Sequence, residues 1–459
     1  MEKKKIKILY VNHIGNVMGG AEHSLAILLK NLNKEVFSPL LLLPDYGPVY
    51  DYFISIGIET YVVPINYLWL PSDRQYYRLL KDFKTRLNWF NEIITKEDID
   101  IIHTNDEEAF DGAIAAKIHS IPHIWHIRHR FINNAQPVFN YFPLHEFGMG
   151  NFINEFSDRV VAVSEDVKKD LNPYIEPKKL SIVYGAIETD KYEIPQIKND
   201  IRKELGFSAD TFLVCSAGRI CKGKGFDVYI DAAAHVLKHC RNVKFLIVGE
   251  EVQKDLVSKL KKQINELQIE GSIYFLGYRQ DFPEILQQID IFTLTSVNEG
   301  LSRVIVEASR ARKPVIATRC GGSGEAVLDG ESGYLVSLNR ADLVAEKIID
   351  LLNKPQLRLE MGEKGRRIVK EKFSAEIHIK NIEAVYYELL RTHQNGGKVN
   401  ILPRIFINLL GEIGDIGMRL IDYEDRIKRL ESFQDGFKNN FLYKGTKKIY
   451  SIFKNGQHK

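Results

Sequence analysis

Continuous apolar runs alternate with helical segments along most of the chain, and the runs 7–12, 211–217 and 243–249 are examples. Strands that are buried on both faces read as such runs, and strands joined by helices form parallel sheets. The segment 191–200 is polar and lacks an apolar period, so it divides the series in two. The sequence therefore predicts an α/β protein with two doubly wound parallel sheets joined by a linker.

The chain of 459 residues is too long for one ordinary hydrophobic core, which favours two or three domains. We place the two α/β domains at 1–190 and 200–372. A helix over 373–392 is expected to return to the first domain, and an amphipathic helical tail is expected over 393–459. Residues 131–152 show no clear period and are expected to form a loop.

Two acids belong to one predicted strand–helix–strand unit. The apolar run 289–295 precedes a polar turn with Glu299 and Gly300, and a helix that contains Glu307 follows at 303–312. The end of a parallel strand and the start of the next helix form the edge at which such units bind ligands. Both acids could therefore face a ligand that rests on the helix N-terminus.

Two glycine-containing turns occupy the same position in other units. The turn from Gly218 to Gly225 carries Arg219 and Lys224, whose charges complement phosphate oxygens. It is a candidate diphosphate site, and a solvated basic turn is the alternative. Gly19 and Gly20 separate the first strand from the first helix, where backbone amides can approach an anion or a sugar. A tight turn that only packs this helix explains the two glycines equally well.

A histidine is the candidate ligand group of the N-terminal half. His126 follows the apolar residues Ile124 and Trp125 and should lie at the carboxyl edge of a strand. Histidine at such an edge can bind a ligand or transfer a proton. A lone histidine is more often structural, and the neighbouring His123 and His129 show that histidine is common in this segment.

Charge, cysteines and hydropathy limit the partners. The net charge of +3 is too small for this length to indicate a nucleic acid polymer as the main partner. The four cysteines have no metal-binding spacing and lie mostly in or beside apolar runs, which indicates thiols in a reducing compartment. No apolar run approaches the roughly 20 residues of a membrane-spanning helix. We expect a cytoplasmic protein.

Two basic and aromatic segments leave a membrane surface open as a partner. Residues 67–96 interleave aromatic with basic side chains, and the tail contains the apolar run 401–410 and the basic segment 443–454. Such segments suit the inner face of a membrane or an anionic acceptor. The alternatives are a surface helix whose aromatic residues pack on its own domain and, for the tail, a docking or dimer helix that would make the protein an oligomer.

The ordered motifs resemble those of the retaining glycosyltransferases of family 4, which have the GT-B fold. The matching segments are Gly19-Gly20-Ala21-Glu22, His126 with its preceding run, Gly218 to Gly225, Glu299 to Glu307, Pro314 to Thr318, and Gly321-Gly322 with Glu325. Together they cover most of 6–392. The set is specific for the family, though not for a substrate.

The resemblance implies two Rossmann-like domains that face each other across a cleft, the first for the acceptor and the second for the nucleotide sugar. Arg219 and Lys224 would bind the donor diphosphate and steady the leaving nucleoside diphosphate. Glu299 would hold hydroxyls of the transferred sugar, and Glu307 would hold the ribose hydroxyls. His126 would contact the sugar near the reacting carbon.

Backbone groups have implied roles too. Gly20, with Gly19 beside it, would let the N-terminal loop close on the diphosphate. The amides of Leu301, Ser302 and Arg303 would meet the sugar or phosphate. No metal ion and no cofactor is implied, since arginine and lysine supply the positive charge. Retention in this family is described as a same-face substitution in which the leaving phosphate takes the acceptor proton.

The implied activity is transfer of a hexose from a nucleotide sugar, such as a UDP- or GDP-hexose, to a glycan or lipid-linked acceptor in cell-surface polysaccharide or glycolipid assembly. Two motifs depart from the family: Gly300-Leu301-Ser302 replaces Gly-Phe-Gly, and His103-Thr104-Asn105 replaces His-x-His. A catalytically silent subunit that stabilises a partner transferase is one alternative, although the donor residues are retained. A nucleotide-sugar epimerase on the same scaffold is another, whereas a phosphorylase would need a cofactor lysine site that the sequence does not show.

Overall fold

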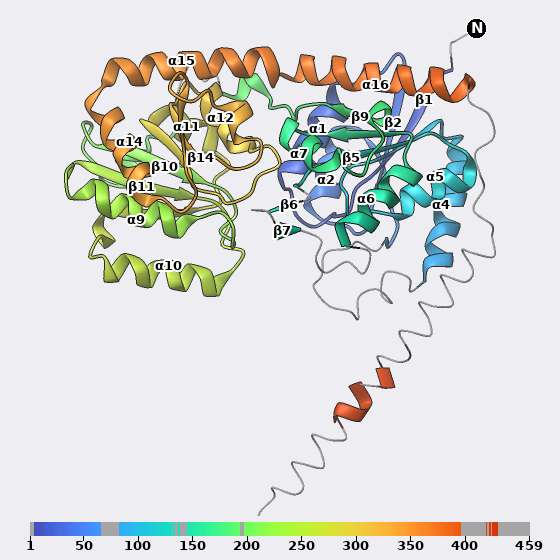
Figure 1. The fold of residues 1–459 in the computed structure, drawn as a ribbon, viewed down its shortest axis with the longest axis horizontal. Helices are drawn as coiled ribbons and strands as arrows, with labels where there is room; N and C mark the ends of the chain where they lie inside the picture. Colours follow the sequence, from blue (N-terminus) through green and yellow to red (C-terminus); the bar gives the residue numbers. More distant parts are fainter. Residues whose placement is uncertain are drawn as a thin grey trace, which may run out of the picture.

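The computed structural model describes residues 4–65, 82–130, 132–133, 136–137, 145–192 and 197–395, with short pieces at 419, 422–423 and 425–429. Two parallel sheets, of seven and six strands, lie in the two halves of the chain (Figure 1). We call residues up to 192 the N-terminal half and residues 197–372 the C-terminal half. The predicted α/β class with two parallel sheets is confirmed.

The first sheet has the strand order β3-β2-β1-β4-β5-β8-β9. Its strands are β1 Ile6–Val11, β2 Phe37–Leu43, β3 Glu59–Val62, β4 Ile101–Thr104, β5 His123–Ile127, β8 Arg159–Ala162 and β9 Leu180–Ile182. The order reverses between β1 and β4, which pair in parallel. Ligands of open α/β sheets bind beyond the carboxyl ends of the strands at such a switch point.

Helices cover both faces of the first sheet. One face packs against α4 Phe83–Glu97, α5 Asp111–His119, α6 His145–Phe156 and α7 Glu165–Leu171, and the other against α1 Gly20–Asn31, α2 Pro48–Ser55 and α16 Ala375–Asn395. A small antiparallel ladder joins β6 Ile132–Asn133 to β7 Gln136–Pro137. The apolar strands are therefore buried on both sides, as their uninterrupted hydrophobic runs predict.

The second sheet has the order β12-β11-β10-β13-β14-β15, with its switch point between β10 and β13. Its strands are β10 Phe212–Ala217, β11 Val243–Val248, β12 Ile273–Gly277, β13 Ile291–Leu294, β14 Val315–Thr318 and β15 Gly333–Val336. The helices of this half are α8 Ile201–Glu204, α9 Phe226–Leu237, α10 Lys254–Glu266, α11 Phe282–Gln288, α12 Arg303–Arg310, α13 Ser323–Ala326, α14 Ala341–Asn353 and α15 Pro355–Lys372. They form cores on both faces of the sheet.

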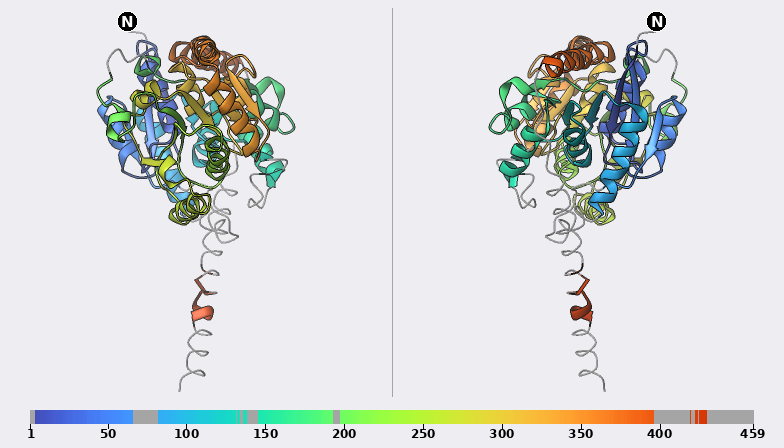
Figure 2. Two further views of the ribbon diagram at one scale, coloured as in Figure 1. Left: turned by 90° about the vertical axis from the view of Figure 1, so that its left-hand side faces the viewer. Right: turned by 90° about the vertical axis from the view of Figure 1, so that its right-hand side faces the viewer.

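Helix α16 connects the two halves. It follows α15 along one side of the molecule and reaches the first sheet (Figures 1 and 2). Its residues Ile382, Val385, Tyr386 and Leu389 join the core formed by β1 and α1. The Tyr386 hydroxyl lies 2.8 Å from that of Tyr10 in β1. The last described helix therefore belongs to the hydrophobic core of the N-terminal half.

The structure changes two expectations about the N-terminal half. Residues 145–156, most of which were expected to lie in a loop, form α6, whose Met149 and Ile153 are fully buried. In the basic and aromatic segment, the described helix α4 packs Phe83 and Phe90 into the core. These two rings are therefore unavailable to a membrane, which favours the packing alternative for α4.

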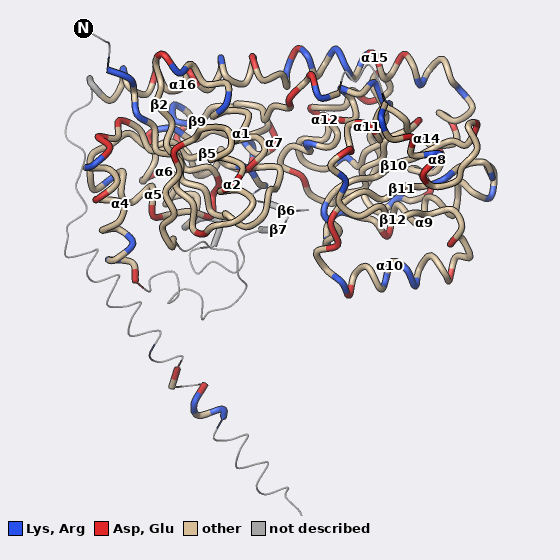
Figure 3. The backbone as a smooth tube through the Cα atoms, turned by 180° about the vertical axis from the view of Figure 1, so that it is seen from behind, with Lys and Arg blue, Asp and Glu red and all other residues tan. Residues whose placement is uncertain are grey.

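The other segments predicted to contact a membrane lie outside the described residues. These are the residues 66–81 of the basic and aromatic segment and nearly all of the tail after Asn395. Among the described residues, no helix combines the length and apolarity needed to cross a bilayer. In the view of Figure 3, acidic and basic residues are spread over both halves.

Candidate functional site

The basic turn lies between β10 and α9 and is held against the end of β13. Gly225, the N-cap of α9, has φ 67°, and a Cβ there would overlap the carbonyl oxygen of Thr295. The Thr295 hydroxyl donates to the Gly225 carbonyl at 2.7 Å. The Val297 amide donates to the Gly223 carbonyl at 2.9 Å. This glycine is needed both for its left-handed backbone and for the close approach of two loops.

An ion pair joins this turn to the first acid of the later motif. Lys224 Nζ lies 2.7 Å from Glu299 Oε1. Partial burial opposes the charged form of Lys224, but the Glu299 carboxylate outweighs this effect and raises the lysine pKa. Arg219 is exposed, and its charge is close enough to lower the pKa of Lys224. The structure thus brings Arg219, Lys224 and Glu299 together, as the sequence predicts.

The start of α12 lies beside this group. Ser302 is its N-cap and is buried, yet its side chain does not cap the helix. The first amides of a helix lack intrahelical partners and carry the positive end of its dipole, so they favour an anion. Leu301 packs against the cores of both halves. Leu301, Ser302 and Arg303 therefore lie at a helix start at the junction of the halves.

The second acid has a different partner. Glu307 is buried in α12, and its Oε1 accepts a hydrogen bond from Arg303 Nε at 2.7 Å. Tyr192 is close to both side chains, and burial followed by the negative charge of Glu307 raises the pKa of this tyrosine. Glu299 and Glu307 are thus held separately, one by a lysine and the other by an arginine.

The N-terminal glycines lie at the start of α1. Gly19 is its N-cap, and the Gly19 amide donates to Glu22 Oε2 at 2.9 Å. A Cβ on Gly20 would meet no atom within 4 Å, so packing alone does not demand glycine there. Burial, followed by the positive charge of Arg303, lowers the pKa of His23 in α1 to about 4. Helix α1 therefore faces α12 across the junction.

His126 is not grouped with these residues. It is the fourth residue of β5, fully buried, with its ring stacked on that of His103 at 5.5 Å between centroids. Neither ring nitrogen has a hydrogen-bond partner among the described residues, and burial holds its pKa well below the usual range. The strand continues through Ile127, so the residue at its carboxyl edge is Arg128 rather than His126.

Arg128 occupies the position expected for the histidine. Its guanidinium donates to Asn105 Oδ1 at 3.2 Å and to Ser24 Oγ at 3.1 Å. Burial lowers its pKa to about 10, so it stays charged near neutral pH. A Cβ on Gly300 would overlap the Arg128 carbonyl oxygen, which shows how closely the halves meet. The sequence signal for this residue is a cation directly after an apolar strand.

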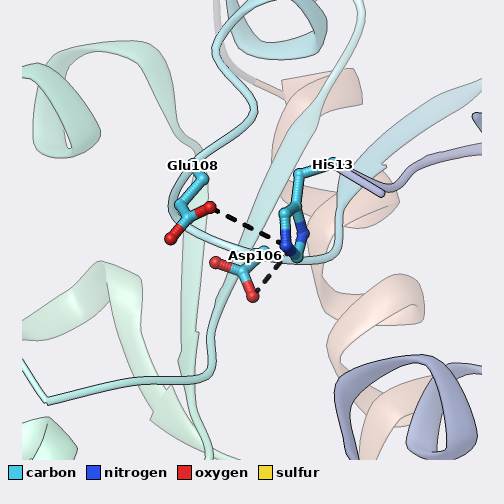
Figure 4. A group of neighbouring side chains, drawn as sticks. All are labelled: His13, Asp106 and Glu108. Atoms are coloured by element: carbon cyan, nitrogen blue, oxygen red, sulfur yellow. Dashed lines mark ion pairs between the residues drawn. The ribbon is translucent and has the colours of Figure 1, made fainter. Parts of the chain in front are cut away.

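A cluster of acids and histidines at the first switch point was not predicted. His13 follows β1, Asp106 and Glu108 follow β4, and His129 follows β5. His13 Nδ1 lies 3.8 Å from Asp106 Oδ2, and His13 Nε2 lies 3.7 Å from Glu108 Oε2 (Figure 4). Burial and the charge of Asp106 raise the pKa of Glu108 to about 9. These residues could hold a metal ion.

A further contact fixes the halves at the same junction. Glu325, from the motif that includes Gly321 and Gly322, accepts hydrogen bonds from the amides of Glu165 at 2.9 Å and Asp166 at 3.3 Å. These amides begin α7, whose positive end attracts a carboxylate. The last part of the motif therefore serves contact between the halves in this structure.

Comparison with known proteins agrees with this division. Residues 18–191 match the family described as Glycosyltransferase Family 4, and residues 197–368 match the Glycosyl transferases group 1. An uncharacterized glycosyltransferase of Methanocaldococcus jannaschii, MJ1178, is 30% identical over 65% of this chain and 78% of that protein. The UDP-Gal:alpha-D-GlcNAc-diphosphoundecaprenol alpha-1,3-galactosyltransferase of Escherichia coli is 23% identical over 84% of this chain and 98% of that protein.

Solved structures show the same architecture. The crystal structure of Anabaena HepE in complex with UDP-glucose superposes with a TM-score of 0.70 and 24% identity, covering 83% of this chain and all of that one. Two parallel sheets, each with a switch point in its strand order, agree with the two family matches. The chain therefore belongs to the family 4 glycosyltransferases, which have the two-domain GT-B fold.

Proposed function

We propose that this protein is a retaining hexosyltransferase that moves a hexose from a UDP-sugar to a lipid-linked or glycan acceptor in the assembly of a cell-surface polysaccharide or glycolipid. The name of the Escherichia coli relative specifies a UDP-galactose donor and a diphosphoundecaprenol-linked acceptor. The HepE complexes contain UDP and UDP-glucose. These names support a UDP donor and a lipid-linked acceptor for the present chain.

The Lys224–Glu299 ion pair at the start of α12 carries the proposal. A lysine, the exposed Arg219 and the uncapped amides of α12 converge there. All three favour negative charge, and such groups stabilise an oxyanion best when they are fixed before the reaction. We assign them to the donor diphosphate and to the leaving UDP. The diphosphate chemistry then draws its positive charge from the protein, without a metal ion or cofactor at this position.

Glu299 and Glu307 would bind the two ends of the donor, the hexose and the ribose. Glu299 stands beside the lysine, so it would accept hydrogen bonds from the hydroxyls of the transferred hexose while Lys224 turns to the phosphate. Glu307 is oriented by Arg303 and would accept from the ribose. Carboxylates suit both tasks because they are strong acceptors for sugar hydroxyls. The phosphates would lie between the two acids.

The N-terminal half would supply the acceptor and close on the donor. Gly19 and Gly20 start α1, which faces α12, so a small movement of this loop would bring its amides to the diphosphate. Because the His126 ring is enclosed in the sheet, we do not assign it contact with the sugar. Arg128, which directly follows β5, is the side chain of this sheet edge that lies beside the junction.

The test is a panel of nucleotide sugars. UDP-hexoses should raise the melting temperature of the protein more than GDP-hexoses, because a ligand that binds only the folded state stabilises it. With a diphosphate-lipid acceptor, NMR of the product should show the same anomeric configuration as the donor. An inverted product would refute retention, and a GDP preference would refute the donor assignment. Binding of every UDP-hexose without transfer to any acceptor in the panel would favour the silent subunit instead.

A further inference from the structure

We propose that the N-terminal half binds a divalent cation of the Mn²⁺ type through His13, Asp106 and Glu108. This site is separate from the donor chemistry proposed above, which uses the basic turn and α12 in the C-terminal half. The three residues follow β1 and β4, the strands on either side of the first switch point. They therefore lie where open α/β sheets bind ligands.

The spacing of the three side chains fits a metal site better than a hydrogen-bonded network. One donor atom from each residue lies within 4.8 Å of the other two. The His13 nitrogens are 3.8 Å from Asp106 Oδ2 and 3.7 Å from Glu108 Oε2, too long for hydrogen bonds. Neighbouring ligands at about 2.1 Å from an octahedral metal are roughly 3.0 Å apart. A contraction of less than about 2 Å would therefore form a metal site.

A second observation concerns Asp106 alone. Its side chain is fully buried, and neither carboxylate oxygen has a hydrogen-bond partner among the described residues. Oδ2 is directed toward two imidazoles, 3.8 Å from His13 Nδ1 and 3.6 Å from His129 Nδ1. In Figure 4 the carboxylates of Asp106 and Glu108 both turn toward the ring of His13. A buried carboxylate without hydrogen bonds is costly, and a bound cation would offset that cost.

The remaining charged neighbours are already engaged. Glu107 accepts from the Arg128 amide at 3.1 Å and lies 2.8 Å from His129 Nδ1. The Arg128 guanidinium bonds Asn105 and Ser24. Glu107 therefore orients His129 and the chain after β5 rather than joining the three ligands. Asp106 is also 3.6 Å from His129 Nδ1, so a cation would share this carboxylate with His129.

The donor set indicates which cation would bind. Two carboxylates and one imidazole suit Mn²⁺, whereas thiolates would select zinc. The ligands come from the loop between β1 and α1 and from the loop between β4 and α5. A cation would tie these loops together just before Gly19. The coordination positions not filled by protein would be taken by water or by an acceptor oxygen.

The experiment is a Mn²⁺ titration of the full-length chain without nucleotide, after treatment with EDTA, followed by electron paramagnetic resonance of the free ion. We expect one bound Mn²⁺ per chain. Asp106→Asn and Glu108→Gln should each weaken binding by at least about tenfold, since loss of a ligand should cost no less than loss of an outer-shell partner. Glu97→Gln, which neutralises an acid in α4 far from this loop, should bind as the parent does.

Absence of stoichiometric Mn²⁺ binding by the parent would overturn the proposal, as would unchanged binding in both acid variants. UDP should still raise the melting temperature of each variant, which shows that the fold and the donor site persist. If the acid variants fail this check, His13→Gln replaces them, and parent-like Mn²⁺ affinity in that variant would overturn the proposal. Failure of UDP binding in the parent would instead count against the proposed function.

Discussion

The two sheets present opposite chemistry at corresponding edges. In the C-terminal half, the switch point carries glycines and the cations Arg219 and Lys224. In the N-terminal half, it carries the buried acids Asp106 and Glu108 beside His13. Both edges arise from the same strand–turn–helix geometry, so the fold supplies a place for a ligand, and the side chains after each strand decide its charge.

Under the proposed function, this difference would give the donor one orientation. An anionic diphosphate is favoured at the basic turn and opposed at the acidic cluster. Contact between the halves is close, since Gly300 lies against the carbonyl of Arg128. A donor at the basic turn would therefore lie near the edge of the first sheet.

The largest expected effect comes from removing the cation of the basic edge. Lys224→Ala should reduce the rate of UDP release with acceptor by about 10²–10³, the cost of losing one preorganised oxyanion partner. It should also leave Glu299 without its ion pair. Steady-state assays with the preferred UDP-hexose measure this change.

Lys222→Ala is the matched control, because Lys222 belongs to the same turn but is exposed, and its backbone amide rather than its side chain donates to Gln253 Oε1. The control should retain roughly parental activity. Equal losses in the two variants would mean that the turn acts through its overall charge, and the specific role of Lys224 would be refuted.

The glycines of the two edges should differ in stability. Gly225→Ala should destabilise the protein by about 2–4 kcal/mol, because φ is 67° and the added Cβ meets the Thr295 carbonyl. Gly20→Ala should change stability by less than about 1 kcal/mol, since its Cβ meets nothing within 4 Å. Thermal and urea unfolding of both variants provide the comparison.

Gly206→Ala is the control that separates the cost of backbone strain from the cost of the steric clash expected in Gly225→Ala. Gly206 has φ 70° with no atom near an added Cβ, so only the left-handed conformation is penalised, by about 1 kcal/mol. If Gly225→Ala cost no more than Gly206→Ala, the close approach of the two loops would not matter. Loss of activity in Gly20→Ala at unchanged stability would support closure of the N-terminal loop on the donor.

The sequence predicts the sheets well because parallel strands are buried on both faces. The runs for β10 and β11 were located to within a residue or so for that reason. Helix α6 was missed, although Met149 and Ile153 are spaced as on one helical face. Its glycines obscured that period, and Gly150 is needed because a Cβ there would overlap Tyr174.

The site was predictable where each residue belongs to a motif that is recognisable by itself. Lys224 and Glu299 lie in turns that directly follow apolar runs, and the structure joins them. The acidic edge needs His13 and Asp106, whose meeting depends on the pairing of β1 with β4. His126 was expected at an edge, but only the register of β5 reveals that Arg128 holds that place. Long-range pairing is the information that the linear pattern lacks.

As pH falls, the N-terminal half should lose folding stability before the C-terminal half does. Burial lowers the pKa of His123 to about 3, and burial together with the Arg128 charge lowers that of His378, on α16, to about 4. Each is below the unfolded value of 6.5, so their stabilising effect is complete above pH 6.5 and is lost as pH falls toward the folded value. Each histidine should therefore lower the free energy of unfolding by roughly 2 kcal/mol at pH 5.

Hydrogen exchange at pH 7 and pH 5, corrected for the intrinsic exchange rate, tests this difference. Peptides from β4 and β5 should lose protection at pH 5, whereas those from β10 and β11 should change less. His378→Gln should reduce the pH sensitivity of the N-terminal half. Equal loss of protection in both sheets would show that buried histidines do not set the acid response.

The smallest expected effect lies in the C-terminal half and has the same sign with pH, but it falls in the alkaline range. Burial lowers the pKa of Lys313 to about 8, even though Asp290 opposes this shift. The folded state therefore binds its proton less tightly than the unfolded state, whose value is 10.5, and the resulting penalty is complete below pH 8. It should disappear as pH rises from 8 toward 10.5.

Lys313→Met keeps the length of the side chain and removes its charge, so it should stabilise the protein at pH 7 by about 1–2 kcal/mol. The gain is limited because Lys313 Nζ donates to the Gln287 carbonyl at 2.8 Å, and this bond is lost as well. Lys354→Met, at an exposed ion pair with Asp350, is the control and should be close to neutral. Urea unfolding at pH 7 and pH 10 should show the gain only at pH 7. A gain that persists at pH 10 would mean that apolar packing, rather than the buried charge, distinguishes the two residues.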